Sequence, residues 1–161
     1  MTYRKPAVER LPSGILIRTA RQEEAPELRM LAIRSKSHWP YPAEFLRRWA
    51  RVMSITPEVI AANDVRVAER SGLVVGFSTV LRRGAVAVLD DLWVDPPEIG
   101  RGTGRLLFED AAERAAAAGA RLLEWEAEPY AVAFYERMGG IRTGYADSPL
   151  GRPLPTMHLP L

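Results

Sequence analysis

The spacing of apolar residues predicts a strand followed by helices in the first third of the chain. An apolar run over 15–17 favours a first strand. A helical period then appears around Leu28 and Leu31. Pro42 opens a second helix, whose apolar side chains fall at i, i+3, i+4 and i+7: Leu46, Trp49, Ala50 and Met53. A short helical segment over 59–62 is expected to follow.

The middle of the chain changes to a period of two, which predicts three antiparallel strands. Polar and apolar residues alternate over 64–70, and apolar runs follow over 73–81 and 86–94. The pairs Ser71-Gly72 and Arg83-Gly84 are typical of tight turns between strands. The three runs are therefore expected to form a meander of adjacent hairpins.

The last third alternates between helical and strand patterns. A helix is expected over 102–118, a strand over 122–127 and a second helix over 131–138. Two final strands are expected over 141–145 and 156–161. Strand–helix–strand succession implies a parallel pair beside the antiparallel meander. The predicted fold class is α/β: a mixed, mostly antiparallel central sheet with helices on both faces.

Length and composition favour one soluble domain. The 161 residues suit a single domain over 1–161, with 1–13 as a loose N-terminal arm. No apolar run approaches the roughly 20 residues of a membrane span. The first residues also lack the apolar stretch of a secretory signal, so a cytoplasmic protein is the default expectation.

The residue counts exclude several kinds of chemistry. There is no cysteine, which excludes disulfides, thiolate catalysis and cysteine-bound zinc. His38 and His158 show no metal-ligand spacing, so no metal site is expected. The net charge is +2, from 22 basic and 20 acidic residues, and the arginines are scattered. A solvated surface is therefore favoured over nucleic-acid binding.

The first chemical motif joins the end of a predicted strand to the start of a helix. Leu92-Trp93-Val94-Asp95-Pro96 is followed by the glycine-rich run Ile99-Gly100-Arg101-Gly102-Thr103-Gly104-Arg105. Glycines allow positive φ, and the first N–H groups of a helix lack internal partners and favour anions. A pyrophosphate cradle supplemented by the two arginines is one interpretation. A tight turn that binds no ligand is the alternative.

The second motif begins at Glu126 and ends at Gly140. It reads Glu-Ala-Glu-Pro-Tyr-Ala-Val-Ala-Phe-Tyr-Glu-Arg-Met-Gly-Gly, a short amphipathic helix after a strand. Phe134 and Tyr135 share its apolar face with Ala131 and Met138. A tyrosine in this position is either a core residue or a functional one.

Together, in this order and spacing, the two motifs resemble those of the GNAT superfamily of acyl-CoA N-acyltransferases. The resemblance covers roughly residues 15–145, and 35–39 and 151–155 look like features of a bacterial branch. It implies transfer of an acetyl group from acetyl-CoA to a primary amine of a small molecule, amino acid or peptide, by direct attack in a ternary complex. Homodimers are frequent in this family. It also implies that the fourth and fifth strands splay apart.

The resemblance assigns roles to individual residues. The backbone of Leu92, Trp93 and Val94 would bind pantetheine, Gly100 to Arg105 the pyrophosphate, and Phe134 the pantetheine side of the cleft. Tyr135 would protonate the departing thiolate. The family places a base on the fourth strand, at positions that match Val88 and Asp90. We expect Asp90 to be the base, with Glu126 in reserve and Asp91 on the opposite side of the strand. His38, Trp39 and Arg152 are candidates for the acceptor site.

Three departures from the family pattern bear on these roles. Ile99 replaces a Gln or Arg, so Arg101 or Arg105 must supply that contact. Glu128 replaces an Asn, and its carboxylate would repel phosphates. Gly140 replaces the closing Phe. A non-catalytic acyl-CoA-binding or partner-binding module is therefore the alternative function.

Overall fold

The structure is a computed structural model that describes residues 14–161. The predicted N-terminal arm over 1–13 lies outside the described residues. None of the helices in the described part is long and apolar enough to span a bilayer.

A single seven-stranded sheet organises the molecule, in the order β1-β2-β3-β4-β5-β7-β6. Every neighbouring pair is antiparallel except β4 and β5, which run parallel. The predicted mixed sheet is therefore confirmed. The strands are β1 (Ile15–Thr19), β2 (Asp64–Arg70), β3 (Leu73–Arg83), β4 (Val86–Val94), β5 (Leu122–Glu126), β6 (Ile141–Ala146) and β7 (Leu154–Pro160).

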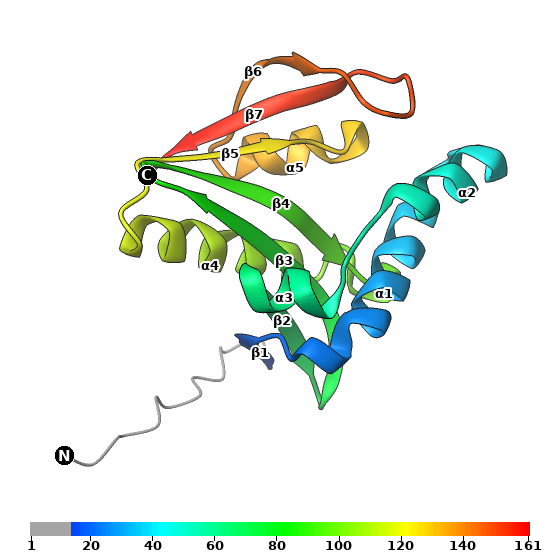
Figure 1. The fold of residues 1–161 in the computed structure, drawn as a ribbon, viewed down its shortest axis with the longest axis horizontal. Coiled ribbons are helices and arrows are strands. Elements are labelled where there is room, and N and C mark those ends of the chain that lie inside the picture. The colour runs from blue at the N-terminus through cyan, green and yellow to red at the C-terminus, as the bar shows by residue number, and fades with distance from the viewer. Residues whose placement is uncertain (1–13) are drawn as a thin grey trace.

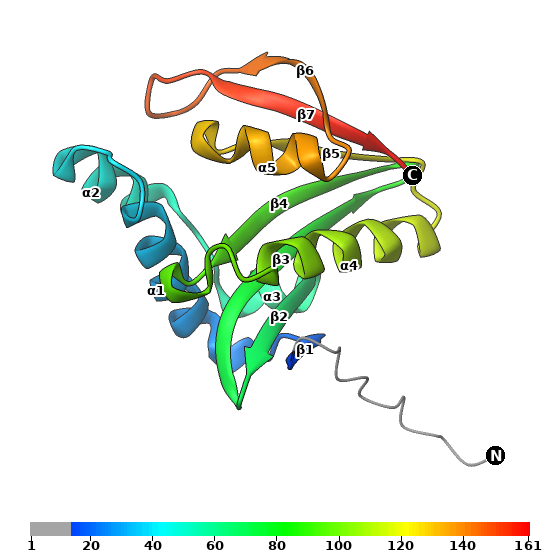
Figure 2. The same ribbon diagram turned by 180° about the vertical axis from the view of Figure 1, so that it is seen from behind.

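Helices cover both faces of this sheet. One face carries the N-terminal helices and the other carries α4 and α5, as the two opposite views show (Figures 1 and 2). The α-helices are α1 (Ala25–Ser37), α2 (Ala43–Val52), α3 (Pro57–Ala62), α4 (Thr103–Ala117) and α5 (Val132–Arg137). Short 3-10 turns precede three of them: η1 (Gln22–Glu24), η2 (Pro96–Glu98) and η3 (Pro129–Ala131).

Separate apolar clusters fill the two faces. On one face, Phe77 of β3 packs with Leu28 and Leu31 of α1. On the other, Trp125 of β5 packs with Phe108 of α4 and Tyr135 of α5. Successive side chains of a strand point to opposite faces of the sheet, so a single strand can contribute residues to both clusters. We call these the acceptor-face cluster and the cofactor-face cluster, after the binding partner that the resemblance to the GNAT superfamily implies for each face.

The parallel pair β4 and β5 separates soon after it forms. Ladder pairing covers only Val86–Val88 against Leu122–Glu124, after which β4 stays with β3 and β5 stays with β7. A bulge marks the divergence: Val80 pairs with Leu89 but Thr79 pairs with Asp91, which leaves Asp90 as an extra residue. Bulges bend a strand and increase its twist. The expected splay is visible as a gap that widens along β4 (Figure 1).

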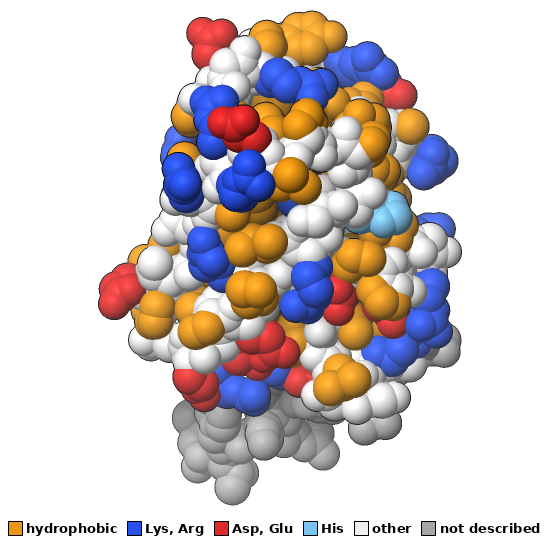
Figure 3. All heavy atoms as spheres, turned by 90° about the vertical axis from the view of Figure 1, so that its right-hand side faces the viewer, with side chains coloured by type: hydrophobic (Ala, Val, Ile, Leu, Met, Phe, Trp, Pro, Cys, Tyr) orange, Lys and Arg blue, Asp and Glu red, His pale blue; other side chains and the backbone are white. Residues whose placement is uncertain are grey.

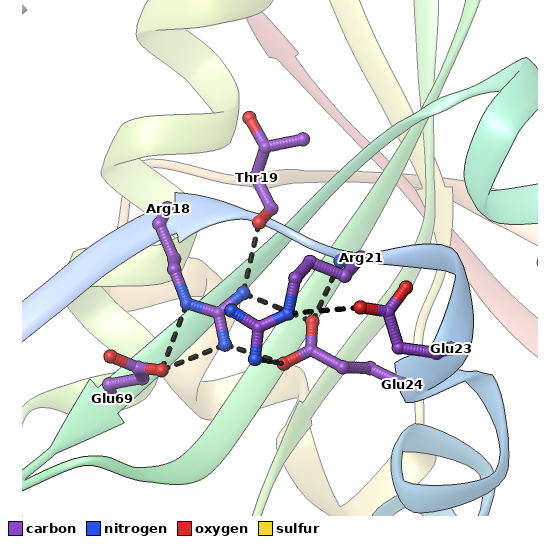
Figure 4. A network of polar contacts seen from close by, with 6 residues as sticks. All are labelled: Arg18, Thr19, Arg21, Glu23, Glu24 and Glu69. Atoms are coloured by element: carbon purple, nitrogen blue, oxygen red, sulfur yellow. Dashed lines mark hydrogen bonds and ion pairs between the residues drawn. The ribbon is translucent and has the colours of Figure 1, made fainter.

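An ion-pair network fastens η1 to the first two strands (Figure 4). The Arg18 guanidinium bonds to Glu24 at 2.5 Å and to Glu69 at 2.8 Å. Glu24 also accepts the Arg21 backbone N–H at 2.7 Å, which caps the start of the helical segment. The Arg18 hydrogen bond holds the pKa of Glu24 below its ordinary value although burial opposes it. The network lies away from the splay and anchors the start of α1.

Gly140 ends α5 and fits tightly against the core. Its N–H donates to the Tyr135 carbonyl at 2.8 Å, and Gly139 adopts φ +92°, which together form a Schellman ending. A Cβ on Gly140 would lie 2.9 Å from both Trp125 Cζ2 and the Tyr135 oxygen. The larger residue that the family pattern has at this position is therefore not accommodated by the present geometry.

We expect Gly140→Ala to destabilise the fold by about 1–3 kcal/mol, because the added methyl must displace an indole ring or a backbone carbonyl. Chemical denaturation of both proteins measures this difference. Equal free energies of unfolding would show that the end of α5 has room to shift, contrary to the packing described.

Candidate active site

A cleft of about 920 Å³ passes through the splay between β4 and β5. Ser35 and Trp39 line it from the acceptor face, and the turn before α4 lines it from the cofactor face. Many of the predicted site residues meet here: Trp39, Asp90, Leu92, Trp93, Val94, Gly100, Gly102, Gly104, Arg105, Glu126, Phe134 and Tyr135. Arg101, Thr103, His38 and Arg152 do not line the cleft.

The glycine-rich turn has the backbone geometry of an open cradle. Gly100 and Gly102 adopt φ +81° and +86°, and a Cβ on either would meet no atom within 4 Å. Gly102 is also the N-cap of α4, so the N–H groups of the first helical turn have no helical partners. Helix polarity favours an anion at this end. The glycines therefore leave both space and donors where the sequence predicts a pyrophosphate.

Glu98 organises the cradle from beneath. It is 5% exposed and accepts hydrogen bonds from Arg70, from Arg101 at 3.0 Å and from the Thr103 hydroxyl at 2.9 Å. Burial alone would raise its pKa, but the bonds from Arg70 and Thr103 hold the pKa below its ordinary value. Thr103 thus contributes its backbone to the turn while its side chain faces inward. Arg101 is half exposed beside the turn.

Tyr135 reaches the cleft from the cofactor-face cluster. Its ring lies 5.0 Å from Trp125 and 5.1 Å from Phe134 between centroids, and the residue is 7% exposed. Burial, with smaller contributions from the charges of Glu128 and Asp91, raises the pKa of its hydroxyl above the ordinary range. The hydroxyl therefore stays protonated at neutral pH and can act as an acid or a hydrogen-bond donor.

The bulge on β4 presents two neighbouring carboxylates. Asp90 lines the cleft and Asp91 does not. Desolvation raises the pKa of Asp90, against a weaker opposing effect of Arg83. Desolvation raises the pKa of Asp91 further, to about 6, although the Trp93 indole N–H donates to it at 3.1 Å. Sequence reasoning named Asp91 but did not predict its raised pKa, because alternation gives a direction and not a degree of burial.

Aromatic rings border the cleft on the acceptor face. Trp39 stacks on Tyr130 with centroids 5.3 Å apart, and His38 lies edge-on to Trp39 at 5.0 Å. The Arg152 guanidinium lies 5.4 Å from the Tyr41 ring. His38 and Arg152 are exposed and do not line the cleft, whereas Glu126 on β5 does. Figure 3 shows the side of the molecule on which β4 and β5 have separated. Charged and apolar side chains are interspersed on this surface.

Glu128 is engaged by protein groups rather than directed at a phosphate. It accepts hydrogen bonds from Lys36 Nζ and from the Tyr41 hydroxyl. The expected repulsion of phosphates is thereby offset by a buried cation. Neither Lys36 nor Tyr41 was predicted as a site residue. Only two features of the sequence could have pointed to these residues. Lys36 is one of only two lysines in the chain, and Glu128 stands where the family has Asn.

The sequence model of the acetyltransferase (GNAT) family matches residues 20–140, which include the turn, the splayed strands and α5. The chain belongs to the GNAT acetyltransferase family. No curated protein sequence matches it. Within residues 14–161 no group of three or more metal-ligating side chains is placed to hold an ion.

Solved structures agree with the fold of this acetyltransferase. A GCN5-related N-acetyltransferase from Rhodopseudomonas palustris is 23% identical, with a TM-score of 0.77 over 90% of this chain and 94% of the other. The PaiA N-acetyltransferase of Thermoplasma acidophilum, in complex with coenzyme A, is 17% identical, with a TM-score of 0.75 over 91% and 99%. A GCN5-related N-acetyltransferase from Kribbella flavida is 25% identical, with a TM-score of 0.68 over 94% and 100%.

The cradle can be tested with two glycines at opposite ends of α4. Gly102→Val should raise the dissociation constant for coenzyme A at least ~10-fold, because a side chain would fill the space above the helical N–H groups. Gly119→Val is the matched control: Gly119 adopts φ +95° with no atom within 4 Å of a Cβ, so the backbone strain is comparable. Isothermal titration calorimetry measures both. Equal affinities for the two variants would contradict the cradle.

The raised pKa of Asp91 predicts a pH-dependent effect of Asp91→Asn on stability. A carboxyl with a raised folded-state pKa favours folding below about pH 4, and this contribution is lost as the pH rises through about 6. The variant should therefore be more stable than the wild type at pH 7.5, by about 1–3 kcal/mol, and similar at pH 4.

For Asp64→Asn we expect the opposite effect: the variant should be less stable than the wild type at pH 7.5. Burial would raise the pKa of Asp64, but Arg114 and its neighbours lower it, so its contribution is present at neutral pH and lost in acid. Denaturation curves at both pH values measure the effect. An Asp91→Asn variant that is less stable than the wild type at pH 7.5 would contradict the described burial.

Proposed function

We propose that this GNAT protein transfers an acetyl group from acetyl-CoA to a primary amine by direct attack in a ternary complex. One observation carries the proposal: a single cleft through the splay is lined by the glycine turn on one face and by Trp39 on the other. A donor bound on the cofactor face can therefore meet an acceptor that enters from the acceptor face. The chain has no cysteine to carry the acetyl group, so direct attack of the acceptor on the thioester is the simpler route.

The cofactor face supplies binding groups that fit a nucleotide thioester. The turn and the start of α4 would hold the diphosphate, with Arg101 and Arg105 beside it. Beyond Val88, the edge of β4 that faces the splay has lost its β5 partner, so its N–H and C=O groups are free to pair with pantetheine amides. Acetyl-CoA, when bound, supplies the acetyl group on its thioester sulfur.

Two carboxylates on the diverging strands suit a cationic amine. Asp90 on β4 and Glu126 on β5 both line the cleft, and neither forms an ion pair within residues 14–161. An aliphatic amine arrives as an ammonium ion, which these groups attract. Asp90, directly or through water, would accept the proton and leave the nitrogen lone pair free to attack. A raised pKa makes Asp90 a better base than an aspartate with an ordinary pKa.

The remaining groups would complete the reaction. An N–H of β4 beyond the last ladder pair would donate to the oxyanion that forms on the carbonyl oxygen. Tyr135 would donate its proton to the sulfur as the carbon–sulfur bond breaks, and the attacking nitrogen would return one proton to Tyr135, directly or through water, which gives the thiol and the neutral acetylated amine. The presence of Phe134 and Tyr135 in the cleft favours an enzyme over a non-catalytic acyl-CoA-binding module.

Tyr135→Phe should lower kcat by about 10²-fold, because the ring remains but the proton donor is lost. Release of free thiol from acetyl-CoA across a panel of amines measures the rate. The dissociation constant for coenzyme A should stay within about threefold of the wild-type value. Because the pKa of Tyr135 lies above the ordinary range, kcat should not fall between pH 7 and 9 through this residue. A variant with full activity would contradict the assigned role.

A further inference from the structure

The connection between β5 and α5 carries a buried carboxylate that the proposed reaction does not use. Glu128 follows β5 closely and is the N-cap of η3. One oxygen accepts from Lys36 Nζ, and the other accepts from the Tyr41 hydroxyl and, at 3.4 Å, from the Tyr130 N–H. Its side chain is only 10% exposed. Protein groups thus satisfy both carboxylate oxygens.

Lys36 is buried as deeply as its partner. The residue is 5% exposed and lies on the last turn of α1. Its Nζ lies 4.6 Å from the centroid of Tyr41, 5.5 Å from Trp49 and 5.7 Å from Phe45. Aromatic faces stabilise a desolvated ammonium, and the carboxylate balances its charge. Removing either partner alone would leave an uncompensated buried charge.

We call Lys36, Tyr41 and Glu128 the clasp, because they connect two parts of the molecule that diverge at the splay. Lys36 and Tyr41 are 92 and 87 positions from Glu128 in sequence. The β4–β5 ladder ends at Val88 and Glu124, before the level of Glu128. Beyond the end of the ladder, side-chain contacts replace backbone hydrogen bonds: those of the clasp and the stacking of Trp39 on Tyr130. They join the corner between α1 and α2 to the segment that leads into α5.

This link connects the two sides of the candidate reaction. Trp39 lies in the α1–α2 corner and borders the acceptor side of the cleft, whereas Tyr135 lies on α5. α5 is only six residues long, so the segment that enters it strongly influences its position. The Glu128 charge also contributes to the raised pKa of Tyr135. Motion of Glu128 would therefore move the proton donor relative to the acceptor wall.

We propose that Glu128 is a positioning residue: held by Lys36 and Tyr41, it fixes the Tyr135 hydroxyl relative to the acceptor wall. The inference rests on the proposed acetyl transfer. Glu128 acts through α5 and contributes no proton of its own. Because the glycine turn lies between η2 and α4, away from the clasp, loss of the clasp should lower kcat and leave coenzyme A affinity unchanged.

The test separates positioning from stability with three variants: Glu128→Gln, Lys36→Met and the double variant. Each single variant leaves one buried charge unpaired and should lower Tm by roughly 10 °C. The double variant removes both charges, and its Tm should return to within about 3 °C of the wild type. Its kcat should nevertheless remain about 10-fold or more below the wild-type value, because small displacements of a reacting group cost rate.

The matched control neutralises a buried ion pair away from the cleft. Arg18→Met with Glu24→Gln removes the pair shown in Figure 4, which touches neither the splay nor α5. Its kcat should stay within about twofold of the wild type, whatever its Tm. If kcat of the clasp double variant recovers together with Tm, the clasp only stabilises the fold and the proposal is wrong. A rise in the dissociation constant for coenzyme A that accounts for the lost rate would equally overturn it.

A second measurement needs no turnover and keeps the two proposals distinguishable. Tyr135 is replaced by 3-fluorotyrosine, and the ¹⁹F line is recorded in wild-type, control and clasp double-variant backgrounds. We expect a single narrow line in the first two and a broadened or divided line in the third. Equal line widths in all three would overturn the positioning role. A wild-type protein that binds coenzyme A but acetylates no amine would instead refute the proposed function.

Discussion

The separation of β4 from β5 is the constraint on which the rest of the structure depends. Three pairs of residues hold the strands together, and the bulge at Asp90 then turns β4 away. Each strand keeps its outer neighbour, so the sheet remains continuous while its centre opens. The opening exposes one backbone edge of β4 and connects the two faces of the sheet. Neither the cleft nor the proposed route between donor and acceptor would exist in a regular parallel ladder.

The charges around this opening fall into two groups. Glu98 and Glu128 are buried and fully engaged by cations and hydroxyls, and they hold the glycine turn and the entry to α5 in place. Asp90, Asp91 and Glu126 form no ion pair within residues 14–161. Desolvation without an ion-pair partner is what raises the pKa of the two aspartates. The paired carboxylates thus hold structural elements in place, whereas Asp90 and Glu126 line the cleft without an ion-pair partner.

Local sequence patterns were enough to predict most of the fold. The period change at Asp64, the turn at Ser71-Gly72 and the helix expected over 102–118 all depend on neighbours within a few residues. The splay and the catalytic role of Tyr135 followed from family resemblance instead, and the roles of individual site residues remain predictions. The clasp escaped prediction because Lys36 and Glu128 meet only after folding. The pKa of Asp91 depends on the depth of burial, which alternation along a strand does not specify.

The central claim is that the glycine turn and the free edge of β4 together bind a thioester and direct it into the splay. A crystal structure of the protein with coenzyme A tests this most directly. We predict the diphosphate within hydrogen-bond distance of backbone N–H groups at 102–105, pantetheine along β4 beyond Val88, and the sulfur beside the Tyr135 hydroxyl. Coenzyme A bound elsewhere on the surface, with the turn and the strand edge unoccupied, would contradict the account.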